Sequence, residues 1–512
     1  MTRPLTIDPD TLTMDAIRGG LLADAPVTVL GFARSGIAMA RFLADAGARV
    51  TVYDGRVADD LGEAIAALEG RSVRLALGPD VEPAATWADA TLVTTSPSIN
   101  PDFPTTEPRL RTALRALVAT RDAGDRSAPA LVSEPDLFLR LCVAPTVGVT
   151  GTKGKTTTAS LAAAILAVEP SHPAVLGGNI GVPILDRLAE LTPEHRVVYE
   201  LSELQLPTLS RGTTVAVYTN VTSDHLDRHG SVDAYRRVKR ILAELVDPAG
   251  ALVLNAEDPI VAAYADLRTA RPVMYRRGTP SSGGLGVVEG WITADGVERL
   301  DRNGGVDGRL MPVDELGIPG AHNVSNALAA VAVGLLFGVE PEGIRAAAAA
   351  FTGVEHRLEP VALVEGVRFV NDSQGTQPDA VIAALRAFPP PVVLIAGGRD
   401  KDVDLSELGP VVAERAAAAV LIGESGPALE RRFRAAGLER TERAATLEAA
   451  VTRADALARK ALAEAAPGTG PATVLLSPAA ASFDMFVDYA ARGRAFKDAV
   501  AELIAIRARR DR

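Results

Sequence analysis

Apolar and polar positions along this chain form blocks, each opening with a short apolar run, passing through glycine and continuing at helical spacing. The first block runs from Pro26 to Gly47 as PVTVLGFARSGIAMARFLADAG; RVTVYD then leads to Asp54, and ATLVTTSPSI follows later. This pattern predicts strand, turn and helix in repeated succession, which is typical of a parallel sheet covered by helices on both faces. We therefore expect an α/β fold.

Two further blocks repeat the alternation. The second opens at residues 145–168 as PTVGVTGTKGKTTTASLAAAILAV and continues with apolar runs in RVVYELS, TVAVYTNV and GALVLNAED. Glycine-rich residues 278–310 predict short hairpins at a sheet edge, and apolar residues 327–339 predict a buried helix that is too short to cross a membrane.

The third block has apolar runs in VRFVND, PVVLIAGG, AAVLIG and ATVLLSP. Three of these runs lead directly into the polar loops DSQGT, GGRDKDVD and SPAAASFD. Ligands in open α/β sheets bind beyond the carboxyl ends of the strands. We therefore expect these three loops to face one crevice.

Length and composition narrow the class of protein. The 512 residues suffice for three domains of roughly 150 residues each, which we place at 1–131, 132–353 and 354–512. A net charge of -11 and only 4% aromatic residues argue against a nucleic-acid-binding surface. The single cysteine, Cys142, excludes a disulfide within the chain and a cysteine-based zinc site. Because the N-terminus lacks the apolar core of a signal peptide, we expect a cytoplasmic protein with no membrane insertion. We also expect it to be a monomer.

The strongest chemical signal is the segment GTKGKTT at residues 151–157, between an apolar strand and an alanine-rich helix. Its glycines let backbone N–H groups crowd around phosphate oxygens, and the helix N-terminus adds a favourable dipole. Lys155 can reach the terminal phosphates, and the Thr156 hydroxyl can ligate Mg²⁺. The strict G-x-x-x-x-G-K-[ST] pattern fails, because its first glycine position falls on Val149. The alternative is an ordinary glycine-rich turn, but the flanking strand and helix favour ATP binding.

Polar residues at two later strand ends could complete a metal site. Glu200 ends RVVYE, and Asp224 and His225 follow TVAVYTNVTS. Mg²⁺ prefers carboxylate, hydroxyl and water oxygens. Taken singly, Glu200 could be a solvated acid and His225 a packing residue. Their joint position after successive strands favours a metal near the phosphates.

Nine motifs then occur in a characteristic order: GTKGKTT, GGNIG, ELSELQL, NVTSDHLDRHG, GAHNVSNALAA, EHRLE, NDSQGT, GGRDKD and LLSPAAASFD. In this order, from Val27 to Lys497, the chain resembles the Mur ligase family. Within the family, the spacing most resembles the ligases of peptidoglycan precursor synthesis that add D-glutamate to UDP-N-acetylmuramoyl-L-alanine through an acyl phosphate, releasing ADP and phosphate. The resemblance implies a Rossmann-like UDP-substrate domain, a central P-loop ATPase-type domain with a mostly parallel sheet, and a Rossmann-like amino-acid domain.

The resemblance also implies roles for individual residues. ATP, with two Mg²⁺ ions, would be held by Gly151, Thr152, Lys153, Gly154, Lys155, Thr156, Thr157, Asn323, Asn326, Arg357 and Asp372. Catalytic residues would be Lys155, Glu200, His225, Lys239 and Asp372, and the metal ligands would be Thr156, Glu200, His225 and a carbamylated Lys239. The UDP-linked substrate would meet Ala33, Arg34, Ser35, Asp54, Gly55, Arg56, Ser96, Pro97, Ser98 and Asn179, and the amino acid Thr376, Lys401, Ser482 and Tyr489. Taken without the resemblance, Lys239 in VDAYRRVKRIL is a solvated helix lysine.

Some positions depart from the commonest family pattern. Gln374 stands where many members have lysine and Glu203 where they have serine; Ser98 replaces glycine and Tyr489 replaces phenylalanine. The first two change the charge near the site, which leaves open a related ligase that adds another amino acid, such as L-glutamate.

Two other classes of protein are disfavoured. An NAD-dependent oxidoreductase is opposed because Gly31-Phe32-Ala33 lacks the second glycine of G-x-G-x-x-G. A regulatory ATP-binding module would not need the amino-acid pocket predicted in the third block.

Overall fold

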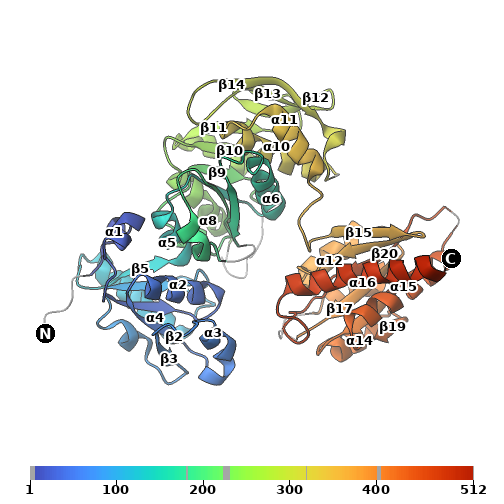
Figure 1. Ribbon diagram of the computed structural model, residues 1–512, viewed down its shortest axis with the longest axis horizontal. Coiled ribbons are helices and arrows are strands. Elements are labelled where there is room, and N and C mark those ends of the chain that lie inside the picture. The colour runs from blue at the N-terminus through green and yellow to red at the C-terminus, as the bar shows by residue number, and fades with distance from the viewer. Residues whose placement is uncertain are drawn as a thin grey trace. The chain divides into compact units, whose positions relative to one another are not determined.

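The computed structural model describes residues 6–179, 183–222, 231–318, 320–399, 405–466 and 468–510. The chain divides into two compact units, Met1–Phe351 and Thr352–Arg512. Three sheets, each covered by helices, confirm the expected α/β fold with mostly parallel strands (Figure 1). The domain boundaries at residues 131 and 353 stay a prediction.

The first sheet is parallel throughout. Its order is β3 (Arg74–Leu77), β2 (Arg49–Asp54), β1 (Pro26–Leu30), β4 (Leu92–Thr95) and β5 (Ala130–Ser133). Its helices are α1 (Met14–Arg18), α2 (Arg34–Asp45), α3 (Gly62–Ala66) and α4 (Pro108–Asp122). The strand order changes direction between β1 and β4, and open α/β sheets bind ligands beyond the carboxyl ends at such a point.

The second sheet has nine strands. Their order is β14 (Gly305–Pro312), β13 (Trp291–Glu298), β12 (Gly284–Val288), β11 (Arg271–Tyr275), β10 (Ala251–Asn255), β9 (Val215–Tyr218), β6 (Thr146–Thr150), β8 (Arg196–Glu200) and β7 (Ala174–Gly178). The strands from β12 to β14 pair antiparallel at one edge, which confirms the hairpins expected in residues 278–310.

Helices cover both faces of the second sheet. They are α5 (Glu134–Leu141), α6 (Lys155–Leu166), α8 (Val232–Leu245), α9 (Pro259–Ala262), α10 (Ala321–Leu336) and α11 (Pro341–Ala350). Helices α6, α10 and α11 pack on one face, where residues 326–336 of α10 are all buried, so the expected buried helix is confirmed. Helices α5, α8 and α9 lie in the core of the other face, which continues into the first sheet. This shared core joins the two sheets into one unit.

The second unit contains a six-stranded sheet. Its order is β15 (Glu359–Val364), β16 (Val367–Asn371), β20 (Ala472–Leu476), β17 (Val392–Gly397), β18 (Ala416–Ile422) and β19 (Thr441–Arg443), with only β15 antiparallel. Its helices are α12 (Pro378–Ala387), α13 (Leu408–Arg415), α14 (Gly426–Ala435), α15 (Leu447–Glu464) and α16 (Tyr489–Arg510). Separate apolar clusters fill its two faces.

Among the helices that the structure describes, none has the length and apolarity needed to cross a bilayer.

Candidate active site

Apart from Asn179, which follows β7 of the second sheet, the residues expected to meet the UDP-linked substrate follow three neighbouring strands of the first sheet. Helix α2 begins at Arg34 directly after β1, and a Cβ on its Gly36 would lie 1.8 Å from the Gly31 carbonyl oxygen. Glycine is therefore needed for this close approach of helix and strand. Ser96, after β4, is buried, and its hydroxyl has no hydrogen-bond partner among the described residues. Ala33 and Ser98 are exposed beside these turns.

Asp54, at the end of β2, organises this edge of the first sheet. It accepts hydrogen bonds from the Phe32 backbone N–H at 2.8 Å and from the Arg56 side chain at 2.9 and 3.0 Å. Burial opposes ionisation of Asp54, but these bonds and the Arg56 backbone N–H outweigh it and lower the pKa of the carboxyl group. The pair holds the turn after β1 against the turn after β2, leaving the exposed Gly55 and half of the Arg56 side chain accessible to an anionic ligand.

The segment of residues 151–157 lies at the carboxyl end of β6, between β8 and β9. Gly154 caps α6 with φ of 86°, and a Cβ there would lie 2.4 Å from Asn326 Oδ1. Lys155 Nζ donates to the carbonyl oxygens of Gly151 at 3.1 Å and Thr152 at 2.9 Å. The first N–H groups of α6 have no acceptor inside the helix, so this end of the helix suits an anion.

The start of α10 packs against this segment. Asn326 is buried, accepts from Thr158 Oγ1 at 3.4 Å and donates to Asn323 Oδ1 at 3.2 Å. The two asparagines expected to contact nucleotide thus adjoin the phosphate loop.

Glu200 ends β8, paired in register with Val149 of β6, and is 1% exposed. Its Oε1 accepts from Asn179 Nδ2 at 3.2 Å, whereas its buried Oε2 has no hydrogen-bond partner among the described residues. An unpaired buried oxygen costs free energy unless a ligand satisfies it. The position therefore fits a hard cation.

Lys239 corrects an expectation. Its local sequence indicates a solvated lysine, but the side chain on α8 is 0% exposed. Nζ donates to Thr150 Oγ1 at 3.2 Å and to the Gly151 carbonyl oxygen at 3.0 Å, and it lies 5.5 Å from the centre of the Tyr235 ring. The Tyr235 hydroxyl lies 3.0 Å from Thr152 Oγ1. Helix α8 therefore brings Lys239 to the phosphate loop, and its role as a metal ligand stays a prediction.

Three expected site residues, Asp224, His225 and Lys401, lie outside the described residues. Within the described part of the chain, no group of three or more His, Cys, Asp or Glu side chains is placed to hold a metal ion.

In the second unit, Asp372 follows β16 and is 4% exposed. It accepts from Ser477 Oγ at 2.6 Å and from the Leu358 backbone N–H at 3.2 Å. Burial raises the pKa of Asp372 to about 6, although these bonds and nearby Arg357 favour the anion. Arg357 itself is exposed.

The described parts of the three polar loops of this unit meet one another, as expected. The Ala479 N–H donates to the Gly375 carbonyl oxygen and the Gly397 N–H to that of Pro478, at 2.9 and 2.8 Å. Ser482 is 3% exposed, while Thr376 and Tyr489 are partly exposed.

A fully buried arginine, which the sequence did not single out, links these loops to α16. Arg492 donates to Ser373 Oγ and to the Ser373 carbonyl oxygen, each at 3.0 Å. It also donates to the carbonyl oxygens of Ala480 and Ala481 at 3.2 to 3.3 Å. Ser373 Oγ in turn donates to the Tyr489 carbonyl oxygen at 2.7 Å.

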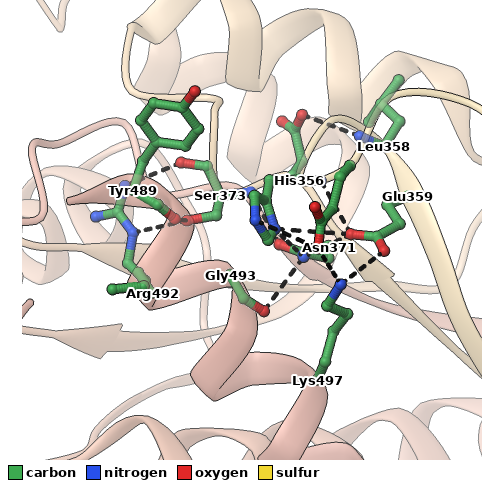
Figure 2. A network of polar contacts seen from close by, with 12 residues as sticks. His356, Leu358, Glu359, Asn371, Ser373, Tyr489, Arg492, Gly493 and Lys497 are labelled. Carbon is green, nitrogen blue, oxygen red and sulfur yellow. Dashed lines mark hydrogen bonds and ion pairs between the residues drawn. The ribbon is translucent and has the colours of Figure 1, made fainter. Parts of the chain in front are cut away.

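Beside Arg492, a second polar cluster surrounds His356, which has φ of 64° (Figure 2). Asn371 Nδ2 lies 2.9 Å from His356 Nδ1 and also donates to Glu359. Because an amide nitrogen only donates, His356 Nδ1 is the acceptor. Burial lowers the pKa of His356, which favours this neutral ring. Lys497 of α16 also belongs to this cluster, because its Nζ donates to Glu359 Oε1 at 3.1 Å.

Family models agree with this architecture. Residues 149–334 match the Mur ligase middle domain, and residues 356–480 match the Mur ligase, glutamate ligase domain. A solved structure of UDP-N-acetylmuramate-alanine ligase from Thermotoga maritima shares the fold, with a TM-score of 0.50, 19% identity and coverage of 93% of this chain and 99% of that one.

Curated relatives match over nearly their whole length. A UDP-N-acetylmuramoylalanine–D-glutamate ligase from Symbiobacterium thermophilum is 38% identical over 486 residues, covering 94% of this chain and 99% of the relative. Another with the same name, from Anaeromyxobacter dehalogenans, is 39% identical and covers 92% of this chain and 96% of the relative. The chain belongs to the Mur ligase family.

Proposed function

We propose that this protein is a cytoplasmic ATP-dependent ligase that adds D-glutamate to UDP-N-acetylmuramoyl-L-alanine, with release of ADP and phosphate, in peptidoglycan precursor synthesis. The observation that carries the proposal is the pairing of a phosphate loop with buried Glu200, whose Oε2 has no protein partner in the described structure. Relatives with this activity in their names, matching over nearly their full length, support the choice of substrates.

The first chemical step must bring two anions together, the substrate carboxylate and the γ-phosphate of ATP. A substrate carboxylate oxygen attacks the γ-phosphorus of ATP, the bond to ADP breaks, and an acyl phosphate results. Lys155 and the N-terminus of α6 neutralise the phosphate oxygens as these two anions approach. The amine of the amino acid then attacks the acyl carbon, phosphate leaves, and the amine loses a proton. Excluding water protects the acyl phosphate from hydrolysis.

Thr156 in the phosphate loop and the nearby Glu200 fit Mg²⁺, because their side chains present hard oxygen donors. Thr156 and Glu200 would hold one ion, with His225 and Lys239 at a second. Bound there, Mg²⁺ would supply positive charge against the phosphate oxygens.

Lys239 suits carbamylation. Its amine is completely buried beside the phosphate loop. In its uncharged form, that amine can form a bond to the carbon of CO₂ and release one proton, which leaves a carbamate whose single negative charge is shared by two oxygens.

The second unit would bind the amino acid and part of ATP. Thr376, Lys401, Ser482 and Tyr489 would hold the amino acid, and Arg357 and Asp372 the nucleotide. Gln374 and Glu203 keep another amino acid, such as L-glutamate, as the second candidate.

ADP release in the presence of Mg²⁺, measured with each substrate omitted in turn, tests the proposal. We expect release only when UDP-N-acetylmuramoyl-L-alanine and D-glutamate are both present. Turnover with L-glutamate, L-alanine or diaminopimelate in place of D-glutamate would overturn the amino-acid assignment. ADP release that needs no UDP-linked substrate would overturn the ligase assignment itself.

A further inference from the structure

The segment Thr219–Thr222, which directly follows β9, runs beside the phosphate loop; we name it the β9 loop. Its Asn220 accepts from the Lys153 backbone N–H through Oδ1 and donates to the Lys153 carbonyl oxygen through Nδ2, each at 2.9 Å. The Asn220 carbonyl oxygen also accepts from the Thr152 N–H at 2.8 Å. One residue thus satisfies three backbone groups of the phosphate loop.

The neighbours of Asn220 add to this contact. Thr219 Oγ1 donates to the Lys153 carbonyl oxygen at 2.6 Å, and the Thr222 N–H donates to Thr152 Oγ1 at 3.0 Å. A Cβ on Gly151 would lie 2.0 Å from Thr219 Oγ1, so the two segments touch. The phosphate loop is therefore built against the β9 loop as well as on its own strand and helix.

The β9 loop is itself held from its far side. Buried Asn255 donates to the Thr219 carbonyl oxygen at 2.7 Å, and the Asp258 carboxylate accepts from the Val221 N–H at 2.7 Å. Side chains from the β10 end thus fix the strand end that carries Asn220. A rigid support of this kind is what a positioning residue needs.

The contacts decide which N–H groups can meet a phosphate. Those of Thr152 and Lys153 point at Asn220, which leaves the first turn of α6 to face a ligand. The same contacts set the orientation of the Thr152 carbonyl group, which accepts from Lys155 Nζ. Asn220 therefore influences both the backbone donors and the cation of the site.

We infer that Asn220 is a positioning residue for the nucleotide phosphates, acting through its reciprocal amide contact with Lys153. This inference rests on the proposed ATP binding. It assigns Asn220 no contact with the nucleotide and no part in the chemical step.

The test compares Asn220→Ala with the parent protein and with Asn303→Ala. Asn303 is an exposed asparagine of the same unit, whose Nδ2 donates to Asp301 at 3.2 Å. Titration calorimetry with Mg²⁺ and a non-hydrolysable ATP analogue gives the Kd, and steady-state kinetics give kcat and the KM of each substrate. Losing two hydrogen bonds predicts a Kd and an ATP KM raised about tenfold to hundredfold in Asn220→Ala. The KM values for the UDP-linked substrate and the amino acid should stay within about twofold, because neither bond orients those ligands.

Asn220→Asp gives a second test with almost unchanged side-chain shape. Its carboxylate still accepts from the Lys153 N–H but faces the Lys153 carbonyl oxygen without a proton to donate. Protonation of the carboxyl group restores a donor, so the Kd ratio to the parent protein should fall as pH is lowered.

The outcomes separate the two proposals. If the parent protein and Asn303→Ala bind the ATP analogue while folded Asn220→Ala binds it equally well, the positioning role is wrong. A smaller active fraction with unchanged Kd would likewise mean a merely structural role. If the parent protein does not bind the nucleotide, the proposed function fails instead.

Discussion

Two fully buried basic side chains mark two regions of this protein, and their surroundings differ. Lys239, in the first unit, donates to one hydroxyl and one carbonyl oxygen beside the phosphate loop. Arg492, in the second unit, donates to a hydroxyl and three carbonyl oxygens that belong to two loops. Their exposed fractions are 0% and 1%. A buried basic side chain therefore contacts the phosphate loop in the first unit and two connecting loops in the second.

The two regions differ in what lies beside the buried side chain. The planar fork of arginine matches several fixed carbonyl groups at once, so the protein itself solvates the cation. Burial lowers the pKa of Arg492 to about 10, and the side chain stays charged at neutral pH. Near Lys239, the same sheet edge carries Glu200 Oε2, which has no hydrogen-bond partner in the part of the chain that the structure describes. We propose that the first region receives a ligand at this edge, and that Arg492 in the second region holds two loops in place.

Replacing Lys155 in the first region should have the largest effect. Lys155→Ala removes the cation at the phosphate loop, and we expect ADP release to fall about a thousandfold or more. The free energy of unfolding should change little, because Lys155 is only partly buried. Steady-state ADP release measures the first quantity and urea unfolding the second. Exposed Lys460→Ala is the control, and turnover above about a tenth of the parent value in Lys155→Ala would contradict the assignment.

Arg492→Met should show the opposite balance. It leaves the Ser373 and Ala480 oxygens buried without their donor, and we expect the free energy of unfolding of the second unit to fall by about 2–5 kcal/mol. Calorimetry on the full chain should show a lower Tm for the second unit, whereas the transition of the first unit, which carries the phosphate loop, should keep its Tm. Arg494→Met, on the exposed side of the same helix, should leave the Tm unchanged. An unaltered Tm in Arg492→Met would show that the hydrogen bonds of Arg492 are not needed for the stability of the second unit.

Gly493→Ala tests the packing of the second region without changing its charge. A Cβ at Gly493 would lie 2.2 Å from His356 Nδ1, so His356 or α16 must move. We expect a loss of about 1–3 kcal/mol in the free energy of unfolding. Gly470→Ala, where an added Cβ meets no atom within 4 Å, is the control. Equal stability of the two variants would mean that the His356 side chain can move aside without a loss of free energy.

Replacing Asp372 should have a smaller effect on stability, and this effect should depend on pH. Its folded pKa of about 6 exceeds the usual value of an unfolded aspartate, about 3.9, so its contribution to stability is fully present below about pH 4 and is lost as pH rises through about 6. Asp372→Asn removes this dependence. Relative to the parent protein, the variant should therefore gain about 1–2 kcal/mol between about pH 4.5 and pH 7.5. Parallel stability curves across this range would show that Asp372 ionises normally.

Sequence patterns predicted the elements with long apolar runs, such as β6, β17 and the buried part of α10, together with the loops that follow the strands. Short strands with weak patterns, such as β3 in RLAL, were not anticipated, because their pairing depends on neighbours far along the chain. The residues of the candidate site also divide into those that the sequence predicted and those that it did not. The phosphate loop is a local pattern, and its position at a strand end followed from the sequence.

The burial of Lys239 and Arg492 did not follow. Each lies in a locally charged helix sequence that indicates a solvent-exposed face. Lys239 contacts Thr150, 89 positions earlier, and Arg492 contacts Ser373, 119 positions earlier. Such contacts are decided by the packing of whole elements. The hydrogen bonds between Asn220 and Lys153, 67 positions away, were not predicted for the same reason.

The burial of α10 has a consequence for how the protein is made. Helix α6 carries the phosphate loop, yet α10, which packs on the same face of the sheet, begins only at Ala321. A nascent polypeptide that has left the ribosome up to residue 318 thus contains every strand of the first two sheets but exposes the apolar surface that α10 will cover. Such surfaces invite aggregation during synthesis. Nucleotide-binding competence should therefore emerge late in translation, only after Leu336 is free to fold.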